Sequence, residues 1–195
     1  MRNAVLAAQP QDWRLVVEGL DRLAAPIVYE KHMTHHMVAG FGLDWTADRR
    51  NAFLIRDPAE MIASYLRKRE SAAFEDFGLD RQADFFEREA DRLGEAPPVV
   101  DAGDVLADPE GVLTALCGRL GVAFDPAMLH WPPGRRPTDG PWAPHWYRAV
   151  EASTGFGPPE APPAVLPDDA HRLADRCRPC YERLWVHRIM PAKVP

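Results

Sequence analysis

One junction within residues 53–70 constrains the fold most strongly. The segment reads FLIRDPAEMIASYLRKRE, so an apolar run ends at Arg56 and helix-start signals follow at once. Asp57 is a favourable N-cap residue, Pro58 suits the first helical position, and Glu60 three residues after the cap completes a capping-box pattern. The junction therefore predicts a strand that passes directly into a capped helix, with Arg56 between the two.

Short apolar runs alternate with helical patterns along the chain. The apolar runs indicate strands covered on both faces, over 26–30, 51–55 and 98–102. Apolar residues at helical spacing predict helices over 11–25, 57–70, 80–93, 108–120 and 168–190, and a short helix starting at Asp125. This alternation predicts an α/β fold with a mostly parallel sheet and helices on both sides.

Length and charge restrict the classes of function. The chain has 195 residues, of which 46% are hydrophobic, so we expect residues 1–195 to form one domain with a real core. Many of the 20 prolines follow residue 130, which predicts a Pro- and Trp-rich loop region over 131–167. The net charge of −6 argues against a nucleic-acid partner, which requires a basic face. The net charge does not exclude a small anionic ligand, because such a ligand needs only a few local cations.

Targeting signals are missing from the sequence. No run of 18 apolar residues occurs, which argues against a membrane span. The first residues, MRNAVLAAQPQDW, have neither the long apolar core nor the cleavage site of a signal peptide. Three cysteines give no disulfide framework. We therefore expect a cytoplasmic protein.

The residues around Arg56 suggest an anion site. Ligands of parallel α/β sheets bind beyond the carboxyl ends of the strands, where a helix N-terminus offers free N–H groups and a positive dipole end. The Arg56 guanidinium suits a phosphate, and Ser64, eight residues on, could add a hydroxyl. In the alternative interpretation, Arg56 pairs with a carboxylate and Ser64 lies in a packing face.

Two blocks resemble the sulfotransferases, which transfer a sulfuryl group from 3′-phosphoadenosine 5′-phosphosulfate (PAPS) to a hydroxyl or amine. FLIRDPAEMIASYLRKR resembles the family's 3′-phosphate-binding segment, where a strand leads through Arg, Asn or Asp, and Pro into a helix with Ser eight residues after the Arg. Arg56 and Ser64 match that pattern in type and spacing. VVDAGDVLADPEGVLTALCGRLGVAFDPAML (99–129) resembles a second strand-and-helix block, although the Tyr and Glu of its turn are absent.

The resemblance implies a fold, a co-substrate and residue roles. The fold would be a three-layer P-loop NTPase-like domain of a bacterial branch, using PAPS and a small-molecule acceptor without a metal. Arg56 and Ser64 would bind the 3′-phosphate. In PIVYEKHMTHH (26–36), His32 matches the family's general base, and the adjacent Lys31 could contact the sulfuryl group, although the two side chains point opposite ways in an extended chain. A structural or surface role for His32 is the alternative.

A later segment, GRRPTDGPWAPHWY (134–147), resembles the family more loosely. Its Arg135 and Arg136 lie in a Gly- and Pro-rich loop beside tryptophans, as in the family's loop that closes over the nucleotide. The alternative is a surface loop held by buried tryptophans.

The family's first strand and 5′-phosphosulfate-binding loop have no counterpart in the sequence. No G-x-x-x-x-G-K-[ST] motif and no loop rich in Pro, Arg and Ser or Thr occurs before residue 26, so the resemblance implies an N-terminally truncated fold. Because caps and apolar faces are intact elsewhere, we expect a longer natural protein with this activity. The alternatives are a non-catalytic nucleotide- or phosphate-binding remnant and an ATP-dependent phosphotransferase of the same superfamily.

Two further motifs have plainer interpretations. The histidines of KHMTHH could bind zinc, but on a strand His35 would face away from His32 and His36, so we expect no metal site. CRPC (177–180) resembles a redox motif, but it lies in a helical pattern, where two cysteines three residues apart are expected to be core residues.

Overall fold

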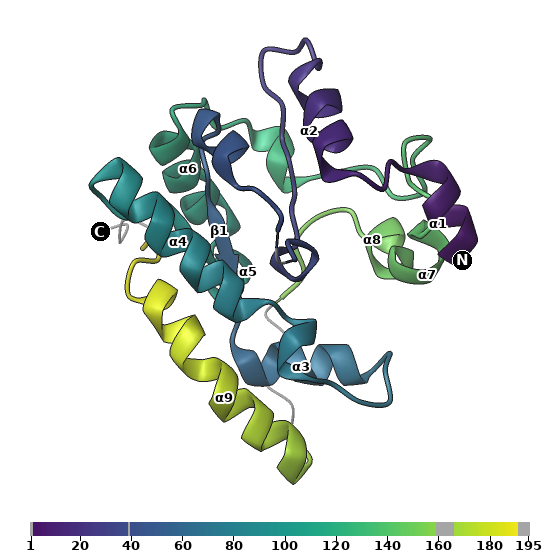
Figure 1. The fold of residues 1–195 in the computed structure, drawn as a ribbon, viewed down its shortest axis with the longest axis vertical. Helices are drawn as coiled ribbons and strands as arrows, with labels where there is room; N and C mark the ends of the chain where they lie inside the picture. The colour runs from purple at the N-terminus through teal and green to yellow at the C-terminus, as the bar shows by residue number, and fades with distance from the viewer. Residues whose placement is uncertain (1, 39, 159–165, 191–195) are drawn as a thin grey trace. The chain divides into compact units, whose positions relative to one another are not determined.

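The computed structural model describes residues 2–38, 40–158 and 166–190 (Figure 1). The chain divides into two compact units: Met1–Lys31 with Pro126–Phe156, and His32–Asp125 with Gly157–Pro195. We call them the first and the second unit and describe each by itself. None of the described helices combines the length and apolar content that a membrane span requires.

The second unit carries the sheet and most of the buried core. Its strands and α-helices are β1 (Phe53–Ile55), α3 (Pro58–Leu66), α4 (Leu79–Leu93), β2 (Val99–Asp101), α5 (Ala102–Ala107), α6 (Pro109–Leu120) and α9 (Asp168–Trp185). Its short 3₁₀ helices are η1 (Thr34–His36), η2 (Asp44–Asp48) and η3 (Phe74–Asp76).

The first unit consists of short helices and loops. Its helices are α1 (Arg2–Ala8), α2 (Trp13–Asp21), η4 (Pro126–Leu129), α7 (Ala143–Trp146) and α8 (Arg148–Ala152). Trp131 is half-buried here: its ring meets Phe156 edge-on at 5.4 Å, and its Nε1 donates a 2.9 Å hydrogen bond to Ser153 Oγ. In contrast, α2 has an apolar stripe but no buried residue.

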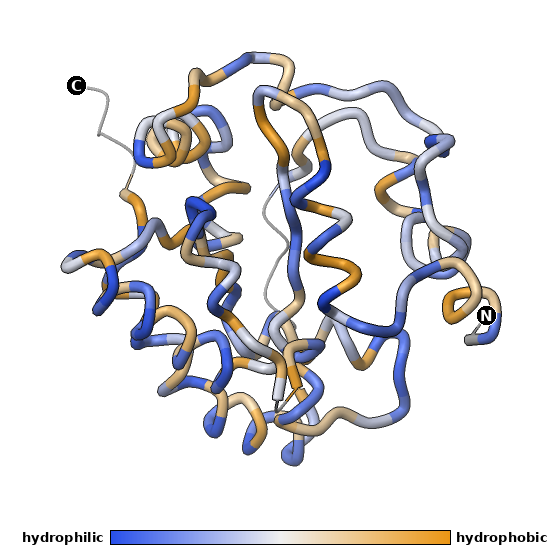
Figure 2. Tube along the Cα trace, turned by 45° about the horizontal axis from the view of Figure 1, so that its top comes forward, coloured by the Kyte–Doolittle hydropathy of each residue, from blue (hydrophilic) through white to orange (hydrophobic). Residues whose placement is uncertain are grey.

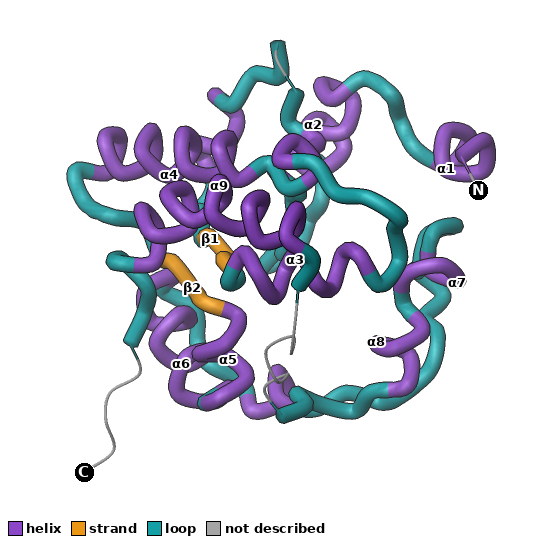
Figure 3. Tube along the Cα trace, turned by 90° about the horizontal axis from the view of Figure 1, so that it is seen from below, coloured by secondary structure: helices purple, strands orange, loops and turns teal. Residues whose placement is uncertain are grey.

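The two strands run parallel and form a short ladder. Ile55, the last residue of β1, is paired with Asp101, the last residue of β2, so both strands end at the same edge. On the other side of β2, the Ile189 N–H donates to the Val99 carbonyl at 2.8 Å. Figure 3 shows α4 and α9 on one side of the strands and α5 and α6 on the other. This arrangement confirms the expected α/β architecture with a parallel sheet.

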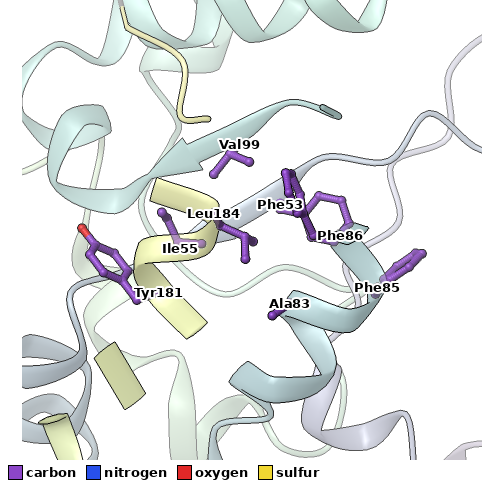
Figure 4. Close-up of a cluster of buried hydrophobic side chains, with 8 residues drawn as sticks. All are labelled: Phe53, Ile55, Ala83, Phe85, Phe86, Val99, Tyr181 and Leu184. Carbon is purple, nitrogen blue, oxygen red and sulfur yellow. The ribbon is translucent and has the colours of Figure 1, made fainter. Parts of the chain in front are cut away.

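A buried cluster joins the sheet to α4 and α9, which lie side by side in Figure 1. Its eight members are drawn in Figure 4: Phe53, Ile55, Ala83, Phe85, Phe86, Val99, Tyr181 and Leu184. Because side chains alternate along a strand, Phe53 and Ile55 share the buried face, whereas Leu54 is 61% exposed on the other.

Two smaller clusters complete the core. One packs α3 against α9 through Ile62, Leu173 and Cys177. The other lies on the opposite face of β2, where Val100 packs with Val112 of α6 and with Ile189. In Figure 2, hydrophobic and hydrophilic residues are interspersed along the helices, as in helices that bury one side.

A buried carboxylate anchors α4 to the segment before β1. Glu89 is only 1% exposed, and it accepts hydrogen bonds from Asn51 Nδ2 at 2.8 Å and from an Arg92 amino group at 2.7 Å. Asn51 Nδ2 also donates to the Thr46 carbonyl at 2.9 Å. The network provides hydrogen bonds to the Glu89 carboxylate, which would otherwise be costly to bury. It also holds the segment before β1 in place.

Most predicted elements form, with shifted ends, but the strand predicted over 26–30 does not. That segment is irregular, and Tyr29 is 86% exposed. A strand requires a neighbouring strand and a covered face, and this segment has neither in the part of the chain that is described. The short apolar run was therefore a misleading signal. Helix α5 was not predicted from the sequence. Residues 159–165 of the predicted 131–167 loop region lie outside the described residues.

Leu184 provides the sharpest test of the core. It is 1% exposed beneath the sheet, so Leu184→Ala should lower the free energy of unfolding by about 2–5 kcal/mol, because it removes buried methyl groups and leaves a cavity. Chemical denaturation followed by circular dichroism measures the loss. Leu54→Ala is the matched control and should cost less than about 0.5 kcal/mol. Equal losses in the two variants would contradict the assigned core.

Candidate functional site

Arg56 lies at the carboxyl end of β1, one residue beyond the strand and directly before α3. Its Nε lies 3.4 Å from Glu60 Oε2, and both side chains are 30% exposed. The carboxylate-pairing interpretation is therefore confirmed for the protein without ligand. The pair is long for a hydrogen bond and partly exposed, so this contact with Glu60 is a weak one.

Asp57 caps α3, as the sequence predicted. Its Oδ1 accepts hydrogen bonds from the Ala59 N–H at 2.8 Å and the Glu60 N–H at 3.3 Å, and the Met61 N–H donates to the Asp57 carbonyl. Pro58 has no N–H. The expectation of free N–H groups at this helix start is therefore wrong, because the cap uses them. An anion here would have to rely on side chains and on the helix dipole.

Ser64 lies two turns into α3 and is half-buried. Its Oγ accepts a 3.0 Å hydrogen bond from Arg67, the residue that ends the helix. Residues 67–69 are Arg, Lys and Arg, directly after the last residue of α3. The structure adds that one of these cations contacts the predicted phosphate-binding serine.

Asp101 occupies the matching position at the end of β2. Its Oδ1 caps α5, accepting from the Gly103 N–H at 2.8 Å and the Asp104 N–H at 3.4 Å. Its Oδ2 accepts a 2.9 Å hydrogen bond from the buried hydroxyl of Tyr181 on α9. Burial, and then the hydrogen bond to Asp101, raises the pKa of Tyr181 well above its usual value. Tyr181 is therefore a neutral donor near pH 7.

Arg178, one turn before Tyr181 on α9, contacts the other capping aspartate. Both of its terminal nitrogens lie 3.3 Å from Asp57 Oδ2, and the Arg178 and Asp57 side chains are 38% and 35% exposed. The sequence analysis missed this residue. The only signal was an arginine on the inward side of the last helix, 121 residues from its partner.

His32 lies at the start of the second unit and is exposed. Its ring meets Trp45 of η2 edge-on, with centroids 5.2 Å apart. Lys31 is exposed and belongs to the first unit. The catalytic roles of His32 and Lys31 stay predictions.

The neighbouring histidines do not follow a strand. His35 and His36 lie in η1, and their ring centroids are 4.1 Å apart. The backbone there packs closely on the start of α4, where Thr34 Oγ1 donates to the Gly78 carbonyl at 2.9 Å. The expectation that His35 faces away from His36 is therefore wrong. Among the described residues, no group of three or more His, Cys, Asp or Glu is arranged to hold a metal ion.

Arg135 and Arg136 lie in an exposed loop of the first unit. The loop is closed by Asp139, whose carboxylate accepts a 2.8 Å hydrogen bond from the Arg136 N–H. The two guanidinium groups and Asp139 line a shallow hollow of about 370 Å³. Their contact with a nucleotide stays a prediction.

The CRPC cysteines are core residues, as expected. Cys177 is fully buried between α3 and α9, and Cys180 is half-buried. Burial, with a smaller contribution from Cys180, raises the pKa of the Cys177 thiol to about 11. Burial also raises the pKa of Cys180. Both thiols are protonated near pH 7, which is the opposite of a redox-active pair.

His35 predicts how stability depends on pH. Burial, and then the neighbouring His36, lowers the pKa of His35 from 6.5, with Asp76 opposing and Arg81 adding to the effect. The unfolded chain therefore takes up the proton first, so stability is present above about pH 6.5 and is lost as the pH falls toward the lower folded value. His35→Gln should flatten the fall in Tm between pH 7 and 5. An unchanged slope in His35→Gln would contradict this.

Comparison with known proteins places the chain in a family. The family described as "Sulfotransferase domain" matches residues 1–184. Two proteins of Arabidopsis thaliana are also similar. "Branched-chain-amino-acid aminotransferase-like protein 2" is 31% identical over 157 residues, which are 80% of this chain and 28% of that protein. "Branched-chain-amino-acid aminotransferase-like protein 1" is 33% identical over 159 residues, which are 82% of this chain and 28% of that protein.

The chain thus spans 28% of the length of these curated relatives. No solved structure matches. The family match covers both strands, the Arg56 turn and all of α9 except Trp185. The chain belongs to the family of sulfotransferase domains.

Proposed function

We propose that the chain is a PAPS-dependent sulfotransferase domain that transfers the sulfuryl group to a hydroxyl or amine of a small-molecule acceptor. The observation that carries the proposal is Arg56, which stands between a buried parallel strand and a capped helix, at the edge of the sheet where ligands of this fold class bind. The proposal includes one P-loop NTPase-like domain over residues 1–195. The family match supports sulfotransfer in general.

The surroundings of Arg56 suit a phosphate group. The contact between Arg56 and Glu60 is 3.4 Å long and both side chains are 30% exposed, so a phosphate with two or three oxygens would compete with Glu60 for the guanidinium. The N-terminal end of α3 adds a favourable dipole. Ser64 and its neighbour Arg67 supply a hydroxyl and a second cation farther along the helix. In the proposal, Arg56 and Ser64 hold the 3′-phosphate of PAPS.

The remaining roles concern the acceptor. PAPS supplies an activated sulfuryl group: its sulfur–oxygen bond to the 5′-phosphate breaks as the acceptor oxygen or nitrogen bonds to sulfur, and 3′-phosphoadenosine 5′-phosphate leaves. His32 takes the proton that the acceptor loses. It is exposed and held on one side by Trp45, so its ring is accessible to an acceptor.

Removing the Arg56 guanidinium should strongly weaken nucleotide binding. Arg56→Ala should weaken binding of 3′-phosphoadenosine 5′-phosphate at least about tenfold, because hydrogen bonds to a charged group are lost. Isothermal titration calorimetry measures the change. Arg88→Ala is the matched control, since it breaks the exposed pair between Arg88 of α4 and Asp44 of η2 and should leave the affinity unchanged. Equal affinities in the two variants would exclude the assigned phosphate site.

His32 is tested by separating turnover from binding. His32→Ala should remove sulfuryl transfer from PAPS while leaving the affinity for 3′-phosphoadenosine 5′-phosphate within about twofold, because a general base acts on the acceptor. His171→Ala, at an exposed position on α9, is the control. A fully active His32→Ala variant would remove the base assignment. Dependence of turnover on ATP and Mg²⁺ in place of PAPS would instead favour a phosphotransferase.

A further inference from the structure

The capping aspartates of the two turns share one pattern of contacts. In Asp57, Oδ1 caps α3 and Oδ2 faces Arg178. In Asp101, Oδ1 caps α5 and Oδ2 accepts from Tyr181. Each aspartate thus uses one oxygen for its own helix and the other for α9.

One face of α9 supplies both contacts. Arg178 and Tyr181 are three residues apart, so they lie on the same side of the helix. Parallel pairing of β1 with β2 places the two turns at the same edge of the sheet, within reach of that side. Figure 4 shows the Tyr181 hydroxyl directed away from the apolar cluster. Apolar residues of the same helix, including Cys177 and Leu184, pack into the core and hold α9 in place.

The two contacts differ in charge, and that difference has a consequence for Arg56. Tyr181 is a neutral donor to a buried carboxylate. Arg178 brings a positive charge to Asp57, which is partly exposed and next in sequence to Arg56. An uncompensated carboxylate next in sequence to Arg56 would oppose the binding of a phosphate there, since like charges repel one another.

We propose that Arg178 is a positioning residue of the Arg56 site. It holds the Asp57 carboxylate in its capping position and offsets the negative charge, so that an anionic group can bind beside Arg56. This inference rests on the proposed function, and it adds the last helix to the apparatus that recognises the 3′-phosphate.

The first test combines charge removal with rescue. Arg178→Gln should weaken binding of 3′-phosphoadenosine 5′-phosphate about tenfold, a typical coupling within an ion-pair network. Adding Asp57→Asn should restore most of the loss, because the amide oxygen still caps α3 but carries no charge. The matched control is Arg183→Gln, also on α9, which breaks the 3.1 Å pair between Arg183 and Glu87 of α4. This variant should bind like the wild type. A merely structural Arg178 would not be rescued by Asp57→Asn.

The second test does not depend on the nucleotide. Hydrogen exchange of the Ala59 and Glu60 amides, which Asp57 protects, should be faster in Arg178→Gln than in Arg183→Gln. Unchanged exchange together with wild-type affinity in Arg178→Gln would overturn the inference, as would a double variant that stays as weak as Arg178→Gln. If the wild type itself binds no nucleotide, the proposed function fails. Exchange then tests only the positioning part of the inference: faster exchange in Arg178→Gln supports a role for Arg178 in holding the Asp57 cap, and unchanged exchange overturns that part as well.

Discussion

The parallel pairing of β1 with β2 is the interaction on which the rest of the second unit depends. Each strand has only three residues, yet the pairing of Ile55 with Asp101 sets both strand ends at one edge. After each strand, the chain turns at an aspartate and begins a helix. Such a short ladder is weak alone, so it needs burial by α4, α9 and α6 to persist. The site and the core therefore share one framework.

Charges alternate around the end of β1. Arg56 pairs with Glu60, and Asp57 pairs with Arg178, so positive and negative groups follow one another within a short stretch of surface. A site of this kind does not attract anions by net charge, which is −6 for the chain. In our proposal, a phosphate takes the place of the Glu60 carboxylate at Arg56, and this requires the Asp57 carboxylate to stay fixed and compensated.

The features that could be predicted from the sequence are those set by residues close to one another along the chain. The Asp57 cap, the two strands and the buried position of the CRPC cysteines all follow from residues within a few positions of one another. Prediction failed where long-range structure decides. The 26–30 run is apolar but lacks a partner strand among the described residues, and Arg178 finds Asp57 only through the packing of α9. The predicted Asp57 cap already implied that its side chain would accept hydrogen bonds from the first N–H groups of α3, and the expectation of free N–H groups overlooked this.

The central claim is that Arg56 recognises a 3′-phosphate. The most direct measurement is calorimetric binding of 3′-phosphoadenosine 5′-phosphate to the folded wild-type chain, with AMP, which lacks only the 3′-phosphate, as the comparison. Our account predicts clear binding of the bisphosphate and an affinity for AMP lower by about tenfold or more, the value expected for lost charge-assisted hydrogen bonds. Equal affinity for the two nucleotides, or no binding of either by a chain shown to be folded, would contradict it.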